Sequence, residues 1–160
     1  MKVGVEGGQQ ASAADIAALE KVIGASLDAQ YRAFVESHDG AEPESNSFPV
    51  GGIAHMGEVR KFIPIREVAS ERRNLPDIGP RAFPVARDSS GNYMFLDQDH
   101  GGAVFFWDHE IRGGISHLAD GFDAFLEMLE PFDESTIESG GGVVVYTNPE
   151  LAKKYGLDST

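Results

Sequence analysis

Apolar residues cluster in three short runs near the middle of the chain, and turn-forming residues separate them. The runs span 83–87, 93–97 and 103–109, and the segments between them are rich in glycine, asparagine, aspartate and serine. Glycine adopts the positive φ angles that tight turns need, and Asn or Asp side chains bond to their own backbone there. The pattern therefore predicts a three-stranded antiparallel meander over residues 83–110.

The third run is apolar on both faces at its start. Side chains alternate along a strand, so Phe105 and Trp107 share one face. Val104 and Phe106 share the other. Because charged residues appear only at 108–110, we expect this strand to lie inside the sheet and to reach solvent at its end.

Helical periodicity predicts two short helices before the sheet. The first begins after the N-cap residue Ser12 and ends at Gly24, and the second begins after Asp28 and ends near His38. Their apolar stripes consist of Ile16, Leu19 and Ile23 in the first helix and of Tyr31, Phe34, Val35 and His38 in the second. Helices this short are unstable alone in water, so both must pack on the sheet.

The remaining elements are weaker in pattern. We expect extended segments at 48–53 and 57–63, a short helix at 65–73, a strand at 115–118, a helix capped by Asp120 and ending at Pro131, an edge strand at 143–147 and a final short helix near 149–156. Together the elements predict an α+β fold, a mainly antiparallel β-sheet with two N-terminal helices and one C-terminal helix packed against it. We expect one domain at 12–132, a flexible N-terminus at 1–11 and a C-terminal extension at 133–160 on the same domain.

Charge narrows the class of partner. The chain of 160 residues carries 26 acidic and 13 basic residues, a net charge of −13. From Asp88 to Glu138 there is only one base, Arg112. Nucleic-acid binding relies on clustered Lys and Arg, so this composition disfavours it and favours a basic protein partner. An acidic surface that serves solubility alone is the simpler interpretation of the same numbers.

The absence of cysteine and of long apolar segments limits the possible site chemistry and the possible cellular location. Without cysteine, thiolate zinc sites, disulfides and a cysteine nucleophile are excluded. No segment approaches the roughly 20 apolar residues of a membrane span, and residues 1–10 lack a signal-peptide core. We expect a soluble, cytoplasmic protein.

Candidate catalytic chemistry is sparse. The glycine clusters lack phosphate-loop spacing, and there is no G-x-S-x-G elbow. One constellation of metal-ligand types consists of Asp97, Asp99, His100, Asp108, His109 and Glu110. Adjacent strands would have to bring these residues together, and their spacing matches no metal motif. Strand ends and turns are polar anyway, so we predict no catalytic residue, no metal and no cofactor, and a metal-dependent hydrolase is the least favoured alternative. The run Phe105, Phe106 and Trp107 is interpreted as core and not as a binding platform.

The order and spacing of these elements resemble the SMI1/KNR4 family, or SUKH superfamily, over residues 12–132. The matching segments are 16–20 and 27–35 in the paired helices, the turn 38–43, the sheet segments 83–88, 91–92, 95–97 and 104–110, and the closing segments 118–119 and 122–126. Two departures occur: Asp28 stands where a proline is common, and residues 39–41 replace a double-glycine turn.

The resemblance implies an α+β fold without catalytic activity. Many bacterial members resemble immunity proteins that neutralise a cognate toxin, often a nuclease, whereas fungal members act in cell-wall signalling. The resemblance and the charge together predict a protein-binding module, most simply an immunity protein with an acidic surface. A regulatory or scaffold module with a non-toxin partner is the alternative. From charge alone, the predicted partner-binding residues are Glu42, Glu44, Asp97, Asp99, Asp108 and Glu110.

Overall fold

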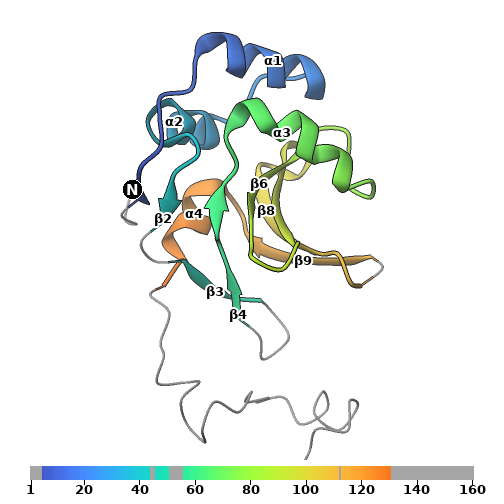
Figure 1. Cartoon of the computed structure of the whole chain (residues 1–160). Helices are drawn as coiled ribbons and strands as arrows, with labels where there is room; N and C mark the ends of the chain where they lie inside the picture. The colour runs from blue at the N-terminus through green and yellow to red at the C-terminus, as the bar shows by residue number, and fades with distance from the viewer. Residues whose placement is uncertain (1–4, 44–45, 51–55, 112, 131–160) are drawn as a thin grey trace, which may run out of the picture.

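The fold is α+β, with helices packed against an antiparallel sheet, as the sequence predicts (Figure 1). A computed structural model describes residues 5–43, 46–50, 56–111 and 113–130. Its helices are α1 (Ala13–Ile23), α2 (Ala29–His38), α3 (Ile65–Glu71) and α4 (Phe122–Glu127), with short 3-10 turns at Arg72–Asn74 and Gln98–His100. Its strands are β1 (Val5–Glu6), β2 (Glu42–Pro43), β3 (Ser47–Pro49), β4 (Met56–Glu58), β5 (Lys61–Phe62), β6 (Ala82–Arg87), β7 (Tyr93–Asp97), β8 (Ala103–Asp108) and β9 (Gly114–Ala119).

The main sheet has five strands in the order β5-β6-β7-β8-β9, all antiparallel to their neighbours. This order confirms the predicted meander and the added strand near 115–118. It also confirms that the third strand of the meander, β8, lies inside the sheet. In the register, Phe95 lies opposite Phe105, and Met94 lies opposite Phe106.

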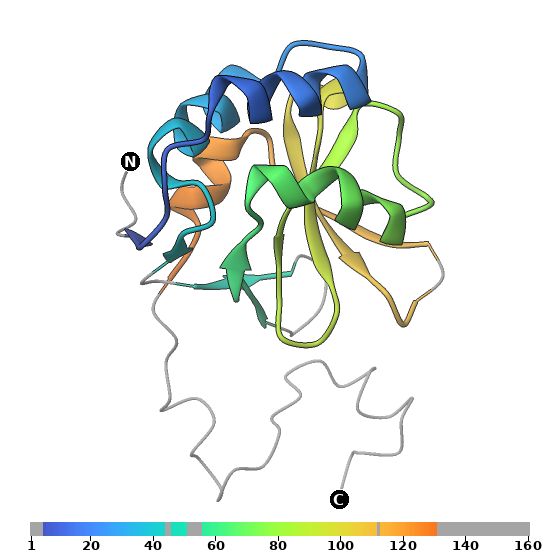
Figure 2. The same cartoon turned by 45° about the horizontal axis from the view of Figure 1, so that its top comes forward.

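One face of this sheet, the inner face, is closed by α2, α4 and β3. It is formed by Phe83, Ala86, Met94, Leu96, Val104 and Phe106, all of them buried. The ring of Tyr31 in α2 lies 5.1 Å from that of Phe83, and Phe48 in β3 lies 6.2 Å from Phe106. Helices α2 and α4 lie side by side over it (Figures 1 and 2). The main hydrophobic core is therefore aromatic and lies between these elements and the sheet.

The opposite face, the outer face, is covered unevenly. Its central residues are Tyr93, Phe95, Phe105, Trp107, Ile115 and His117. Near β6, α3 and the turn after it cover this face: Glu71 pairs with Arg87 at 2.6 Å, and Asn74 donates to the Tyr93 hydroxyl at 3.0 Å. In the part of the chain that the structure describes, this cover does not extend to β9, where Ile115 is 39% exposed.

Local capping begins α1 and α2 where the sequence predicts. The Ser12 hydroxyl accepts the backbone N–H of Asp15 at 3.0 Å, and the Asp28 carboxylate accepts that of Tyr31 at 3.0 Å. Gly24 ends α1 in a left-handed conformation, at φ 69°. A glycine is favoured there because it has no Cβ to clash with the following carbonyl.

The beginnings of α3 and α4 are capped by residues distant in sequence. Asp39, just after α2, accepts the backbone N–H of Ile65 at 2.7 Å. Gln30 in α2 accepts the backbone N–H of Asp123 at 2.9 Å. The prediction that Asp120 caps α4 is wrong, because the N-cap is Gly121 and the Asp120 carboxylate instead lies 2.9 Å from Nε2 of His117.

Two other boundaries differ from the sequence prediction. Helix α4 ends at Glu127 and not at Pro131, because Glu130 forms two backbone hydrogen bonds with Ser47, at 2.7 and 2.9 Å. The extended segment at 57–63 is two strands in different sheets, since β4 pairs with β3 whereas β5 joins the main sheet.

The N-terminal segment forms more contacts than a flexible terminus implies. Strand β1 pairs with β2, and Gln9 exchanges two backbone hydrogen bonds with Asp39, at 2.9 and 2.8 Å. The bounds predicted for the terminus at 1–11, the domain at 12–132 and the extension at 133–160 stay predictions. The predicted strand at 143–147 and helix near 149–156 lie outside the described residues.

Candidate functional site

The acidic residues predicted from charge lie in three separate places. Glu42 is exposed in β2, and Glu44 lies outside the described residues. Asp97 and Asp99 lie where β7 turns toward β8, and Asp108 and Glu110 lie where β8 turns toward β9. The structure does not bring the five described residues together into one surface.

Asp97 is occupied by structural contacts. It is only 6% exposed, and its carboxylate accepts the backbone N–H of Asp99 at 2.9 Å. Its other oxygen lies 2.9 Å from Nδ1 of His100. Asp99 is exposed and pairs with Arg81 at 3.3 Å. Asp97 thus stabilises the turn between β7 and β8. Asp99 is exposed to solvent, but its carboxylate already forms an ion pair with Arg81.

The second pair also contains one structural residue. Asp108 accepts the backbone N–H of Glu110 at 2.9 Å, while the Glu110 side chain is 80% exposed. His109 bonds to Asn92, with Nδ1 2.7 Å from Oδ1 of that residue. Among the predicted acids that the structure describes, Glu42 and Glu110 are thus the most open to a partner.

The Asp/His constellation is split between the two ends of β8. Asp97 pairs in register with Ala103 at the start of β8, whereas Asp108 is its last residue. A strand rises about 3.3 Å per residue, so the two groups lie roughly 17 Å apart along it. The idea that adjacent strands bring them together is wrong. In the described part of the chain, no group of three or more His, Asp or Glu side chains is placed to hold a metal ion.

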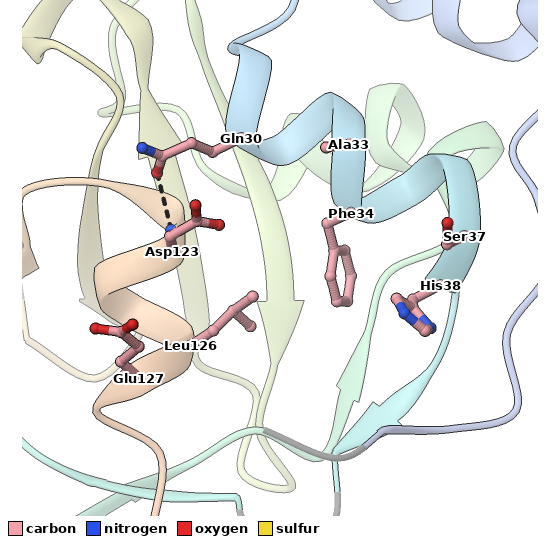
Figure 3. A pocket seen from close by; sticks show the side chains of 8 residues that line it. All are labelled: Gln30, Ala33, Phe34, Ser37, His38, Asp123, Leu126 and Glu127. Carbon is pink, nitrogen blue, oxygen red and sulfur yellow. Dashed lines mark hydrogen bonds between the residues drawn. The ribbon is translucent and has the colours of Figure 1, made fainter. Parts of the chain in front are cut away.

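A groove with uncompensated charge lies between α2 and α4 (Figure 3). It has a volume of about 310 Å³ and is lined by Gln30, Ala33, Phe34, Ser37, His38, Asp123, Leu126 and Glu127. Its floor consists of the apolar side chains of Phe34 and Leu126, which are nearly buried at 5% and 2% exposed. The rim is polar on both sides.

Helix geometry explains why these residues share the groove. Residues three or four apart lie on one side of a helix, so Gln30, Ala33 and Phe34 follow each other along α2, as do Asp123 and Leu126 along α4. The hydrogen bond from the Asp123 N–H to Gln30 ties the two helices together at one end (Figure 3).

Aromatic contacts fix the floor in place. The Phe34 ring lies 4.7 Å from Phe62 and 5.1 Å from Phe122, with tilted rings in both pairs. At the other end of the groove, His38 lies 5.6 Å from Phe34. Because these contacts hold the Phe34 ring in place, this part of the floor is already formed before a partner binds.

The groove is acidic. Asp123 and Glu127 are exposed, and neither forms an ion pair with any residue in the described ranges. The lining contains no Lys or Arg. In Figure 3 the Asp123 carboxylate projects from α4 toward the gap between the helices. A group that binds here must offset negative charge above an apolar floor.

A second hollow, of about 380 Å³, lies beside the N-terminal segment and is electrostatically mixed. It is lined by Gly8, Gln9, Gln10, Ser12, Asp15, Asp39, Gly40, Lys61, Pro64, Arg66 and Glu67. Burial raises the pKa of Asp39, and the bond from the Ile65 N–H partly opposes that rise. Because Lys61 and Arg66 accompany the acids there, this hollow lacks the charge excess of the α2–α4 groove.

Sequence reasoning did not find the groove. The periodicity of α2 and α4 identifies Phe34 and Leu126 as core-facing residues but does not indicate that the helices are neighbours. Gln30 and Asp123 are 93 positions apart. The sequence shows that both are polar and stand beside apolar stripes, but it does not show that they meet.

Within the described ranges, no helix has the length and apolar character needed to cross a membrane. The chain matches the family described as SMI1 / KNR4 family (SUKH-1) over residues 10–128. The match spans more than half of the chain, includes both walls of the groove and confirms the resemblance found in the sequence. No curated protein matches the chain significantly.

Proposed function

Because the chain belongs to the SMI1/KNR4 family (SUKH-1), we propose that it is a non-enzymatic protein-binding module that acts as a bacterial immunity protein. In this role it binds and neutralises a cognate toxin in the cytoplasm. The observation that carries the proposal is family membership over residues 10–128. The net negative charge of the chain then indicates which kind of toxin it binds.

The charge of the chain supports a basic toxin, such as a nuclease. The net charge is −13, and the segment from Asp88 to Glu138 contains a single base. Nuclease active sites are basic because they bind phosphate, and complementary charge accelerates the association of two proteins. An acidic protein is therefore well suited to cover such a site.

The arrangement of polar residues supports a role without catalysis. The candidate hydrolase residues lie at opposite ends of β8, and Asp97 is buried in contacts that hold a turn. A general acid or base must come within hydrogen-bond distance of a substrate. The Asp97 carboxylate is buried, and both of its oxygens already have hydrogen-bond partners.

Co-expression with the toxin encoded beside this chain tests the proposal. We expect the chain to restore growth of cells that produce the toxin, and to co-purify with it as a complex. A toxin variant without activity controls for effects on expression. If no toxin is encoded nearby and the chain protects against none, the immunity role is wrong. A stable complex with a non-toxin protein would instead support the regulatory or scaffold alternative.

The dependence of association on salt tests the acidic surface. We expect the association rate constant to fall about tenfold between low and physiological ionic strength. The double variant Glu42→Gln/Glu110→Gln removes two exposed charges and should lower the rate at low salt without changing the fold. An association rate that is independent of salt would contradict a charge-guided interface.

A further inference from the structure

The floor of the α2–α4 groove suits the stem of a long side chain. Phe34 and Leu126 form an apolar surface that the rings of Phe62 and Phe122 hold in place. Long basic side chains bury their methylene stems on such surfaces while the charged head stays at the polar edge. The floor alone would accept any apolar group, so the rim decides the occupant.

The rim favours a cation. Asp123 and Glu127 lie four residues apart on α4, so they share one side of the helix above Leu126. Neither is in an ion pair with another residue in the part of the chain that the structure describes. Two carboxylates at the rim repel an anionic occupant, and an apolar occupant would displace their water without replacing its hydrogen bonds.

We propose that the α2–α4 groove receives an arginine side chain of a basic protein partner. The planar guanidinium group lies flat on apolar and aromatic surfaces and offers paired N–H donors that fit a carboxylate. A lysine ammonium group supplies charge but not the paired donors. The inference rests on the proposed function, because it names the chemical group through which the toxin engages this chain.

Opposite the carboxylates, the groove is open to a neutral donor or acceptor. Ser37 and His38 line the α2 side, and Gln30 already accepts the Asp123 N–H at one end. The polar side chains that remain available to an occupant are therefore Asp123 and Glu127 on α4 and Ser37 and His38 on α2. In the proposed arrangement the arginine stem lies across Phe34, and the guanidinium group meets the Asp123 carboxylate, which projects toward the gap between the helices (Figure 3). Glu127 adds negative charge one turn further along α4.

A matched pair of small probes tests the groove in the full chain. N-acetyl-arginine amide is titrated into ¹⁵N-labelled protein, with N-acetyl-citrulline amide as the neutral probe of nearly the same shape. We expect saturable shifts for the backbone amides of Ala33, Phe34 and Glu127 with the arginine probe, and binding at least about tenfold weaker with citrulline. Equal shifts with both probes would mean an adventitious additive only and would overturn the proposal.

Variants separate the groove from general acidity. The double variant Asp123→Asn/Glu127→Gln should weaken binding of the arginine probe about tenfold or more, and Glu127→Gln alone by a smaller factor. Asp77→Asn removes one exposed charge outside the groove, as Glu127→Gln removes one inside it, and should leave binding unaltered. The melting temperature of each variant confirms folding, and Glu127→Gln serves if the double variant unfolds. An equal loss in Asp77→Asn would overturn the proposal.

The same variants distinguish failure of the inference from failure of the proposed function. If the neighbouring toxin binds the chain and Asp123→Asn/Glu127→Gln binds it with unchanged affinity, the toxin uses another surface and the groove proposal is wrong while the immunity role stands. If the toxin binds no form of the chain, the proposed function fails. If the double variant loses both probe and toxin, whereas Asp77→Asn retains both, the proposal is supported.

Discussion

The two faces of the five-stranded sheet are similarly apolar in sequence but very differently covered. On the inner face, Phe106 is 3% exposed beneath β3 and α4. On the outer face of the same strand, Phe105 is half-buried: it stacks on Phe95 at 5.3 Å and contacts the His100 and His117 rings edge-on. Neighbouring aromatic residues in one strand thus have different surroundings.

This difference shows that the apolar character of a face and its contribution to stability are separate properties. The inner face is closed by three elements, so removing a side chain there leaves a cavity. Among the described residues, helix α3 and the turn after it cover the outer face near β6 and not near β9, so we expect water to replace a side chain removed near β9. Stability should therefore depend strongly on the inner face and weakly on the outer face near β9.

Phe106→Ala is expected to have the largest effect. It removes a buried ring that packs on Phe48, which should lower the free energy of unfolding by about 3–5 kcal/mol. Urea denaturation of the full chain, followed by circular dichroism, measures the loss. A loss below about 1 kcal/mol would mean that the inner face is not the main core.

Phe105→Ala should cost less, about 1–2 kcal/mol, because the ring is already partly in contact with water. The same denaturation measurement applies, with Phe106→Ala as the matched variant in the adjacent position. The contrast between the two faces breaks down if the two variants are equally destabilised.

Tyr31→Phe should stabilise the protein by about 1 kcal/mol. The Tyr31 hydroxyl is buried, and no residue in the described ranges bonds to it, so its removal relieves a desolvation cost while the ring contacts with Phe83 and Phe122 remain. Burial, with a smaller contribution from Asp39, raises the pKa of Tyr31 above its ordinary value of 10.0.

The raised pKa of Tyr31 adds a test at alkaline pH. Above pH 10 the folded state holds the phenol proton more tightly than the unfolded state does, so stability falls as the pH rises. The variant lacks this loss, and its advantage should grow with pH. A destabilised Tyr31→Phe protein at neutral pH would mean that the hydroxyl has a bonding partner.

Ile115→Thr should have the smallest effect, within about 0.5 kcal/mol of zero. Ile115 is 39% exposed on the outer face of β9, and threonine keeps the branched Cβ that favours a strand. Thermal melts alone are sufficient to detect a change of this size. A large loss would show that the outer face near β9 is covered in the folded chain.

The candidate site was predictable only in part, for a physical reason. The caps at Ser12 and Asp28 are bonds within one helical turn, so a short sequence pattern reveals them. The groove depends on the approach of Gln30 and Asp123, which are 93 positions apart and have no shared local pattern. The charge-based residues that the structure describes lie apart, because composition counts charges without placing them, and their role in binding stays a prediction.

The sequence by itself determined the meander, the two capped N-terminal helices and the family, because alternation, periodicity and turn chemistry act over a few residues. Only the tertiary structure decided which face of the sheet is closed, which residues cap α3 and α4, and that α2 and α4 enclose an acidic groove. These features arise where distant elements compete to bury the same apolar surface, and that competition is settled by packing across the whole chain.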